Sequence, residues 1–252
     1  MADRTMALIG GSSFDSGWLP GMAEIPGSRR TPYGEASSPV WEGILHGRRV
    51  LFLLRHGEGH RYPPHAVPSP ANLWALREAG ADEVVAVATV GGISPRLGPG
   101  AIVIPDDLVD CTRGRASTIY TGPETGVRHI DFTRPFDEGI RARLGAAADR
   151  AGIPVEPSGV YWCTEGPRLE TAAEVRAIRA LGGDMVGMTA CPEAAVAREL
   201  GLPYALVSLS VNWAAGIAES ASGIDFALVA GGMEEKNRSV RALLDAFVAG
   251  GC

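Results

Sequence analysis

The sequence predicts a single α/β domain that spans residues 1–252. Short apolar runs of strand length alternate with stretches of helical periodicity along the whole chain, which is the pattern of an α/β fold. Hydrophobic residues make up 46% of the 252 positions, enough for a sizeable core. Since no linker, internal repeat or low-complexity tract divides the chain, we expect one domain.

Charge and cysteine content argue against several classes of protein. The formal net charge is -6, which does not suit a nucleic-acid partner. The four cysteines lie far apart without a CxxC pair and the five histidines are scattered, so a structural zinc site is not expected. The first apolar run is too short for a signal peptide, and no run reaches membrane-spanning length. We therefore expect a cytoplasmic protein with reduced thiols and no membrane contact.

The first expected strand, residues 6–9, runs into the turn Gly10-Gly11-Ser12-Ser13. Backbone amides and two hydroxyls at such a turn suit an oxyanion. The alternative is that the glycines only permit positive φ in the turn. The turn matches neither G-x-G-x-x-G nor the P-loop, so it indicates neither a dinucleotide nor ATP.

A hairpin is expected from the two apolar runs at 40–45 and 49–54. Its second strand leads into Arg55-His56, with His60 shortly beyond. Arginine supplies a permanent charge and a planar fork of donors, and histidine adds a further donor. The pair therefore suits an anion, and a plain surface Arg-His pair is the alternative.

The rest of the chain continues the alternation. Ser69 is expected to cap a helix with Pro70 at its first position. The apolar strand 84–89 is expected to be buried on both faces and to end in an open turn at 89–92. Further elements are expected as a polar, turn-rich stretch at 27–38, strands at 101–104, 107–109, 160–163 and 204–211, and helices at 136–151, 192–200 and 225–249.

Polar side chains gather in two turns around a short helix in the stretch 163–193. Thr171 and Glu174 have the capping-box spacing that starts this helix. A loop at a strand end is where α/β folds keep ligand chemistry. Residues 111–135 show no regular pattern, and a loop of that length is more often functional than idle. The turns carry Glu165, Arg168 and Glu170 before the helix and Met188, Thr189 and Glu193 after it.

A series of short motifs follows in order over nearly the whole chain: IGGSS (9–13), TPYGE (31–35), LLRHG (53–57), PPH (63–65), ANLWAL (71–76), TVGGIS (89–94), EGPRLET (165–171) and GMTACPEA (187–194). Such a series is far more specific than any single glycine loop. It resembles the purine nucleoside phosphorylase and methylthioadenosine phosphorylase family. Within the family, NWAAG at 212–216 is similar to the bacterial S-methyl-5'-thioinosine phosphorylase branch.

The resemblance implies a three-layer α/β sandwich with a central mixed sheet, and a pentosyltransferase that acts in purine salvage. Such an enzyme cleaves a purine nucleoside with inorganic phosphate, giving the free base and a sugar 1-phosphate. It implies a homotrimer without metal or organic cofactor, in which phosphate is a substrate. The position of His129 resembles one that reaches a neighbouring subunit's active site.

The resemblance also assigns side chains to the phosphate. Oriented donors and electrostatics supply most of the catalysis such a reaction needs, because charge develops as the glycosidic bond breaks. His56 is expected among the catalytic groups as well. The expected phosphate ligands are Ser12, Arg55, His56, Thr89, Val90 and Thr189.

At the purine, Glu170 resembles the glutamate that contacts N1 of the base in 6-oxopurine enzymes. Hypoxanthine carries a hydrogen on N1 that a carboxylate accepts, whereas adenine presents a lone pair there. Asn212 resembles the residue that contacts N7 and the 6-substituent. The adenine-specific branch has aspartates at the positions of Asn212 and Ala214, so this chain is expected to prefer hypoxanthine or guanine. For Glu170, the alternative is a carboxylate that only stabilises a helix N-terminus.

At the sugar, Met188 is expected to pack on the ribose and His60 to lie near the sugar and phosphate. Leu169 replaces the phenylalanine that stacks near the base in the family. Ile224 and Leu228, together with Phe226, stand where ordinary nucleoside phosphorylases place a histidine for the 5'-hydroxyl. An apolar wall suits a methylthio group, and plain core residues of a helix are the alternative.

These residues favour phosphorolysis of S-methyl-5'-thioinosine. A general 6-oxopurine nucleoside phosphorylase and an S-methyl-5'-thioadenosine phosphorylase are the alternatives within the class. A nucleoside-binding protein without turnover and a nucleoside hydrolase are the alternatives outside it.

Overall fold

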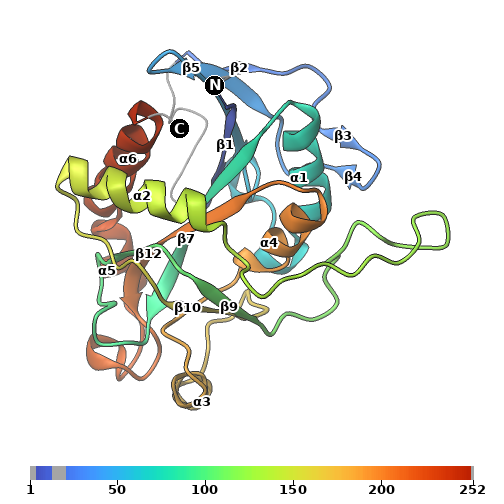
Figure 1. The fold of residues 1–252 in the computed structure, drawn as a ribbon. Helices are drawn as coiled ribbons and strands as arrows, with labels where there is room; N and C mark the ends of the chain where they lie inside the picture. Colours follow the sequence, from blue (N-terminus) through green and yellow to red (C-terminus); the bar gives the residue numbers. More distant parts are fainter. Residues whose placement is uncertain (1–3, 13–20, 251–252) are drawn as a thin grey trace.

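The computed structural model describes residues 4–12 and 21–250, in which helices pack on both faces of one central sheet (Figure 1). Its strands are β1 Met6–Gly10, β2 Ala23–Glu24, β3 Arg30–Thr31, β4 Gly34–Glu35, β5 Trp41–Leu45, β6 Arg48–Leu54, β7 Glu83–Gly92, β8 Ile102–Val103, β9 Asp107–Asp110, β10 Val160–Cys163, β11 Met185–Gly187 and β12 Tyr204–Trp213. Its α-helices are α1 Ser69–Glu78, α2 Glu138–Ala151, α3 Ala172–Ala180, α4 Ala190–Glu199, α5 Phe226–Gly231 and α6 Met233–Ala249. None of these helices is long and apolar enough to cross a bilayer.

The main sheet mixes parallel and antiparallel pairs, as expected. Its order is β2-β5-β6-β1-β7-β11-β10-β9, and β12 pairs with both β7 and β8. β1, β6, β7 and β12 run parallel to one another, and so do β9, β10 and β11. The antiparallel pairs are β5 with β2 and β6, β8 with β12, and β11 with β7. A separate two-stranded hairpin of β3 and β4 lies within the turn-rich stretch.

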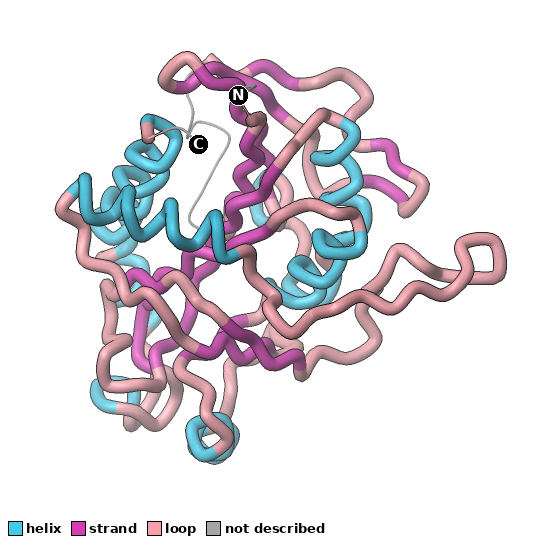
Figure 2. Tube along the Cα trace, in the orientation of Figure 1, coloured by secondary structure: helices cyan, strands magenta, loops and turns pink. Residues whose placement is uncertain are grey.

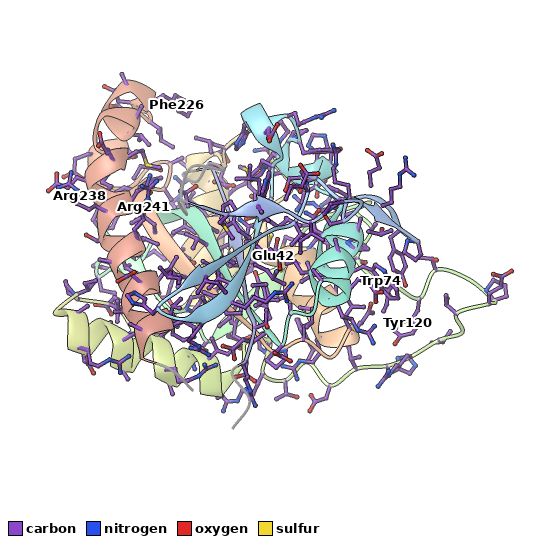
Figure 3. The ribbon with its side chains drawn as sticks, turned by 90° about the horizontal axis from the view of Figure 1, so that it is seen from above. Glu42, Trp74, Tyr120, Phe226, Arg238 and Arg241 are labelled. Atoms are coloured by element: carbon purple, nitrogen blue, oxygen red, sulfur yellow. The ribbon has the colours of Figure 1, made fainter. Side chains whose placement is uncertain are left out.

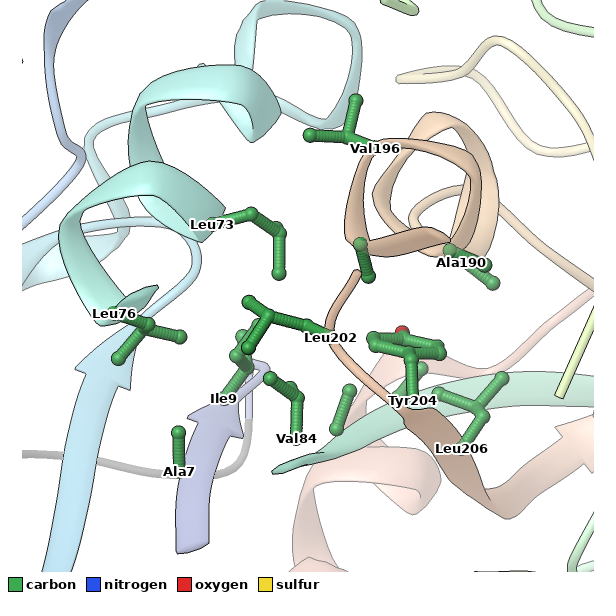
Figure 4. Close-up of a cluster of buried hydrophobic side chains, with 14 of the residues drawn as sticks. Ala7, Ile9, Leu73, Leu76, Val84, Ala190, Val196, Leu202, Tyr204 and Leu206 are labelled. Carbon is green, nitrogen blue, oxygen red and sulfur yellow. The ribbon is translucent and has the colours of Figure 1, made fainter. Parts of the chain in front are cut away.

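Alternate residues of β1 divide the core into two halves. Ala7 and Ile9 point into a cluster with α1 and α4, and Met6 and Leu8 into a cluster with α2 and α6. This follows from the period of two along a strand. The first cluster surrounds Leu202 in Figure 4. Helices therefore cover both faces of the sheet, and the chain forms a three-layer sandwich.

β7 changes its partner along one edge, and this opens the sheet at the site. β1 pairs with Glu83 to Ala86, and β11 pairs with Gly91 and Gly92. In the described part of the chain, no strand pairs with that edge at the positions between. Thr89 lies in this interval, so the carboxyl end of β7 is accessible beside the end of β1.

Several expected elements begin or end one or two residues away from the observed bounds, and three expectations about local structure are wrong. Residues 89–92 are not a turn, because β7 continues to Gly92, where the carbonyl of Leu97 leaves no room for a Cβ. Ser69 does not cap α1: Pro68 is the N-cap residue, and no side chain donates or accepts there. The expected helix 225–249 is two helices, which meet at Gly231-Gly232.

The segment between β9 and α2 is the long irregular loop that the sequence predicts. It projects from the sandwich and carries no helix or strand (Figure 2). Tyr120, labelled in Figure 3, lies on this loop and packs against the first core cluster. The exposed His129 lies in the same loop.

Candidate active site

A cavity of about 230 Å³ opens beside the carboxyl ends of β1, β7 and β12. This is the edge at which open α/β sheets bind ligands. The cavity collects most of the expected site residues, from segments as far apart as β1 and α5. They are Ser12, Arg55, His56, His60, Thr89, Val90, Leu169, Glu170, Met188, Thr189, Asn212, Ala214 and Ile224.

Two expected residues are not among those that line the cavity. His129 is exposed on the long loop, and its expected contact with another subunit remains a prediction. The side chain of Leu228 lies outside the described residues.

Other lining residues had no role in the expected site. Val229 follows the expected Phe226 by three residues, so both project from one side of α5, and helical spacing could have found it. Pro64, Val186 and Val211 also line the cavity. Nothing in their local sequence separates them from ordinary core or turn residues.

Arg55 lines the cavity and forms a buried ion pair with Glu193. Its Nε and Nη2 donate to the two carboxylate oxygens of Glu193, each at 2.8 Å, and its Nη1 donates to the Val87 carbonyl at 2.6 Å. Tyr204 donates to the same carboxylate at 2.7 Å. Burial lowers the pKa of Arg55, but attraction and hydrogen bonding to Glu193 outweigh it and raise the pKa above its ordinary value.

This pairing determines what Arg55 can offer a ligand. Its charge is already balanced by Glu193, and three of its five N–H groups are used. Nη1 and Nη2 each retain one N–H for an anion. Arg55 thus supplies oriented donors and a dipole, rather than an isolated positive charge.

His56 is held as a neutral ring with a known tautomer. Its Nδ1 lies 2.8 Å from the Tyr62 carbonyl oxygen, which can only accept, so Nδ1 carries the hydrogen. Burial, and after it the charge of Arg55, lowers the pKa of His56 to about 4. The ring of His60 stacks on that of His56 at 4.2 Å. At neutral pH the Nε2 atom of His56 is therefore a hydrogen-bond acceptor.

The carboxylate of Glu170 is oriented by the residue that follows β10. Thr164 donates its hydroxyl to Oε1 of Glu170 at 2.6 Å. This contact fixes one oxygen and leaves the second for a ligand donor. The next residue, Thr171, caps α3 in the expected capping box with Glu174. Both an oriented carboxylate and a helix start are thus present at this turn.

Asn212 owes its position to a β-bulge. The register between β12 and β7 shifts between Ser210 and Asn212, which leaves Val211 as the extra residue. Neighbouring residues of a regular strand point to opposite faces, yet Val211 and Asn212 both line the cavity. Nδ2 of Asn212 donates to the Trp213 carbonyl at 2.6 Å, so one N–H and Oδ1 remain for a ligand.

Met188 is held against the turn that leads to Glu170. Gly166 in that turn has φ of +65°, and a Cβ there would collide with the sulfur of Met188. Only glycine satisfies both conditions. The turn before α3 and the turn after β11 therefore pack closely at this point.

The family model of the phosphorylase superfamily matches residues 5–249. The chain belongs to the phosphorylase superfamily. It is accordingly an enzyme of the nucleoside phosphorylase type, a pentosyltransferase.

Individual members of the superfamily are similar over most of their length. A 6-oxopurine nucleoside phosphorylase of Pyrococcus furiosus is 45% identical over 218 residues, covering 84% of this chain and 81% of the relative. A probable S-methyl-5'-thioinosine phosphorylase of Pseudomonas syringae is 51% identical over 186 residues, covering 74% and 76%.

A solved structure shares the fold of this member of the superfamily. The methylthioadenosine phosphorylase of Schistosoma mansoni, in complex with adenine, superposes with a TM-score of 0.90 at 30% identity. The match covers 98% of this chain and 91% of that structure. It agrees with the three-layer sandwich described above.

Proposed function

We propose that this enzyme cleaves S-methyl-5'-thioinosine with inorganic phosphate, giving hypoxanthine and 5-methylthioribose 1-phosphate. The observation that carries the proposal is the pairing of Glu170 with Asn212 in one cavity, beside the donors of Arg55 and Thr189. A carboxylate and an amide suit a base with a ring N–H and a carbonyl. The hydroxyl and guanidinium groups suit an oxyanion.

At the base, the free oxygen of Glu170 accepts N1–H of hypoxanthine. The remaining N–H of Asn212 donates to O6, and Oδ1 accepts from N7 as the base leaves with a proton there. The orientation of each group supports these roles, because Thr164 and the Trp213 carbonyl already occupy their other atoms. Adenine would set a lone pair against Glu170, a mismatch that costs a buried hydrogen bond.

At the phosphate, Arg55 and the hydroxyls of Ser12 and Thr189 donate to the oxygens, together with the open edge of β7 at Thr89 and Val90. The neutral His56 accepts a hydrogen bond at Nε2 from a hydrogen phosphate or from a sugar hydroxyl. Its depressed pKa supports this assignment, since a protonated ring has no acceptor to offer.

At the sugar, Met188 packs on the ribose and an apolar wall receives the methylthio group. Ile224, Phe226 and Val229 line this part of the cavity, which supports a thioether over a hydroxyl. One such group contributes about 1–3 kcal/mol of discrimination. Preference for the methylthio substrate is therefore expected to be graded rather than absolute.

The second candidate is a general 6-oxopurine nucleoside phosphorylase. The 45% identical relative of Pyrococcus furiosus carries that name, and the base contacts above would serve inosine equally well. S-methyl-5'-thioadenosine is the third candidate substrate, because the S. mansoni structure shares the fold. Asn212 and Ala214 argue against this adenine nucleoside, because they occupy positions of aspartates in the adenine-specific branch.

A substrate panel tests the proposal. Base release from S-methyl-5'-thioinosine, inosine and S-methyl-5'-thioadenosine is measured with and without phosphate, and kcat/KM is compared. We expect the first substrate to lead and release to require phosphate. A wide lead for the adenine nucleoside would refute the base contacts. Release without phosphate would indicate a hydrolase, and binding without release a nucleoside-binding protein.

We further propose a cytoplasmic homotrimer that needs no metal or organic cofactor. The exposed loop that carries His129 supports an assembly, because a projecting loop can reach a neighbouring subunit. Light scattering on the purified protein tests the trimer. Activity that survives dialysis against a chelator tests the absence of a metal requirement.

A further inference from the structure

Arg115 lies near the start of the long loop, yet its side chain is only 5% exposed. Each of its five N–H groups has an acceptor. Nη1 donates to the carbonyls of Met188 (2.7 Å) and Cys191 (3.0 Å), and Nη2 to those of Thr164 (3.2 Å) and Glu165 (2.6 Å). Nε donates to the Glu165 carboxylate at 3.2 Å.

These acceptors belong to the two turns that carry the proposed nucleoside and phosphate contacts. One turn leaves β10 and leads to Leu169 and Glu170, and the other leaves β11 with Met188 and Thr189. The turns start side by side, since the amide of Thr164 donates to the Gly187 carbonyl at 2.9 Å. Beyond that bond the guanidinium bridges them.

One contact extends from Arg115 to the proposed base site. Nη2 holds the carbonyl of Thr164, and the hydroxyl of the same threonine orients Glu170 at 2.6 Å. On the other side, Nη1 holds the carbonyl of Met188, which lines the cavity. Arg115 itself does not line the cavity.

We propose that Arg115 is a positioning residue for catalysis: it sets the spacing between the turn that carries Glu170 and the turn that carries Met188 and Thr189. The inference rests on the proposed function, because it assigns the first turn to the base and the second to sugar and phosphate. A planar fork of donors fixes several carbonyls at once, which a flexible ammonium cannot do. Misplacement of reacting groups by about 1 Å can cost ~100-fold in rate.

The base of the loop is held separately from its tip. The carboxylate of Glu165 also accepts from the Arg113 amide at 2.8 Å, and Glu199 accepts from Thr118 and from the Ile119 amide, each at 2.7 Å. Residues 121–129 beyond this anchor are exposed. The ordered base of the loop, rather than its projecting part, therefore supports the site.

The test compares Arg115→Met with Arg141→Met as a matched control. Arg141 on α2 also ties carbonyls of separate segments, with Nε donating to Pro105 at 2.9 Å and Nη2 to Pro157 at 2.6 Å. Its side chain is 12% exposed, and its acceptors do not line the cavity. Arg115→Met loses four hydrogen bonds to backbone carbonyls and Arg141→Met loses two, but only those of Arg115 lie at the site.

The quantities measured are kcat, KM for nucleoside, and the ratio of kcat/KM between 6-oxopurine and 6-aminopurine nucleosides, each per folded molecule. For Arg115→Met we expect kcat/KM to fall by about 10- to 100-fold and the ratio to shift by about 10-fold, since Glu170 loses its support. Arg141→Met should leave both unchanged. Thr164→Val removes the hydroxyl that donates to Glu170 at 2.6 Å and lies 3.4 Å from the Gly187 carbonyl, and it should shift the ratio in the same direction.

Normal kinetics and a normal ratio in folded Arg115→Met would overturn the inference, as would equal losses in Arg141→Met. Should Arg115→Met not fold, Arg115→Lys carries the test. It keeps the charge but not the fork, so it should fold and still lose at least about threefold in kcat/KM; wild-type kinetics would overturn the inference. A wild-type protein that favours 6-aminopurines would refute the proposed function alone, because a loss of rate on its preferred substrate in Arg115→Met would still support the positioning role.

Discussion

Replacing His56 by asparagine tests whether the folded protein holds this ring neutral. His56 as a residue is 5% exposed, and its Nδ1 donates to the Tyr62 carbonyl. Burial, followed by the charge of Arg55, lowers its pKa from 6.5 to about 4. An asparagine amide keeps a donor near the position of Nδ1 but does not titrate.

The sign of the effect follows from proton linkage. Between about pH 6.5 and about pH 4, the unfolded chain binds a proton at His56 that the folded ring does not. Acid therefore favours unfolding in this window, and the stability contributed by the neutral ring is lost as the pH falls. At ~1.4 kcal/mol for each pH unit, the difference corresponds to about 3 kcal/mol.

Urea denaturation of both proteins between about pH 7 and about pH 4 measures this contribution. The free energy of unfolding of the wild type, minus that of His56→Asn, should fall by about 3 kcal/mol across the range and then level off. Subtracting the variant removes the titrations that both proteins share. A difference that stays constant with pH would refute the assignment of a buried neutral ring.

Further substitutions test the base site, the buried ion pair and a helix start. Asn212→Asp should shift the ratio of kcat/KM toward 6-aminopurine nucleosides by at least about 10-fold, and an unchanged ratio would count against the base contacts. Glu193→Gln should lower the free energy of unfolding by about 3–5 kcal/mol in urea titrations, because it leaves the buried Arg55 uncompensated; a loss below about 1 kcal/mol would mean that the pair is dispensable. Thr171→Ala should cost about 1 kcal/mol in the same assay by removing the cap of α3, whereas no loss would show that the cap adds nothing measurable.

Local sequence was sufficient where the controlling interactions lie within a few residues. β10 has the bounds predicted from its apolar run, and the capping box at Thr171 is present as predicted. The prediction of one continuous last helix was wrong. Its apolar pattern continues through Gly231-Gly232, whereas α5 ends at Gly231 and α6 begins at Met233. The glycine pair was the local signal of this break.

In the candidate site, too, some features could be predicted from local sequence and others depend on contacts between distant residues. Motif resemblance identified Arg55, Glu170 and Asn212, but not the contacts that decide their chemistry. Glu193 lies 138 positions from Arg55 in sequence, and their hydrogen bonds appear only after folding. No local pattern marks the bulge at Val211, which depends on the register of β12 against β7.

The amino-acid sequence by itself determined the class of fold and the order of most elements, and its motifs nominated the candidate side chains for a nucleoside and phosphate. These follow from periodicity, turn chemistry and short motifs, all of which act over neighbouring residues. Only the tertiary structure decided that Arg55 is charge-balanced, that His56 is neutral and that Arg115 joins two turns. Those properties depend on burial and on partners distant in sequence, because charge state and hydrogen-bond satisfaction are set by surroundings that the folded chain creates.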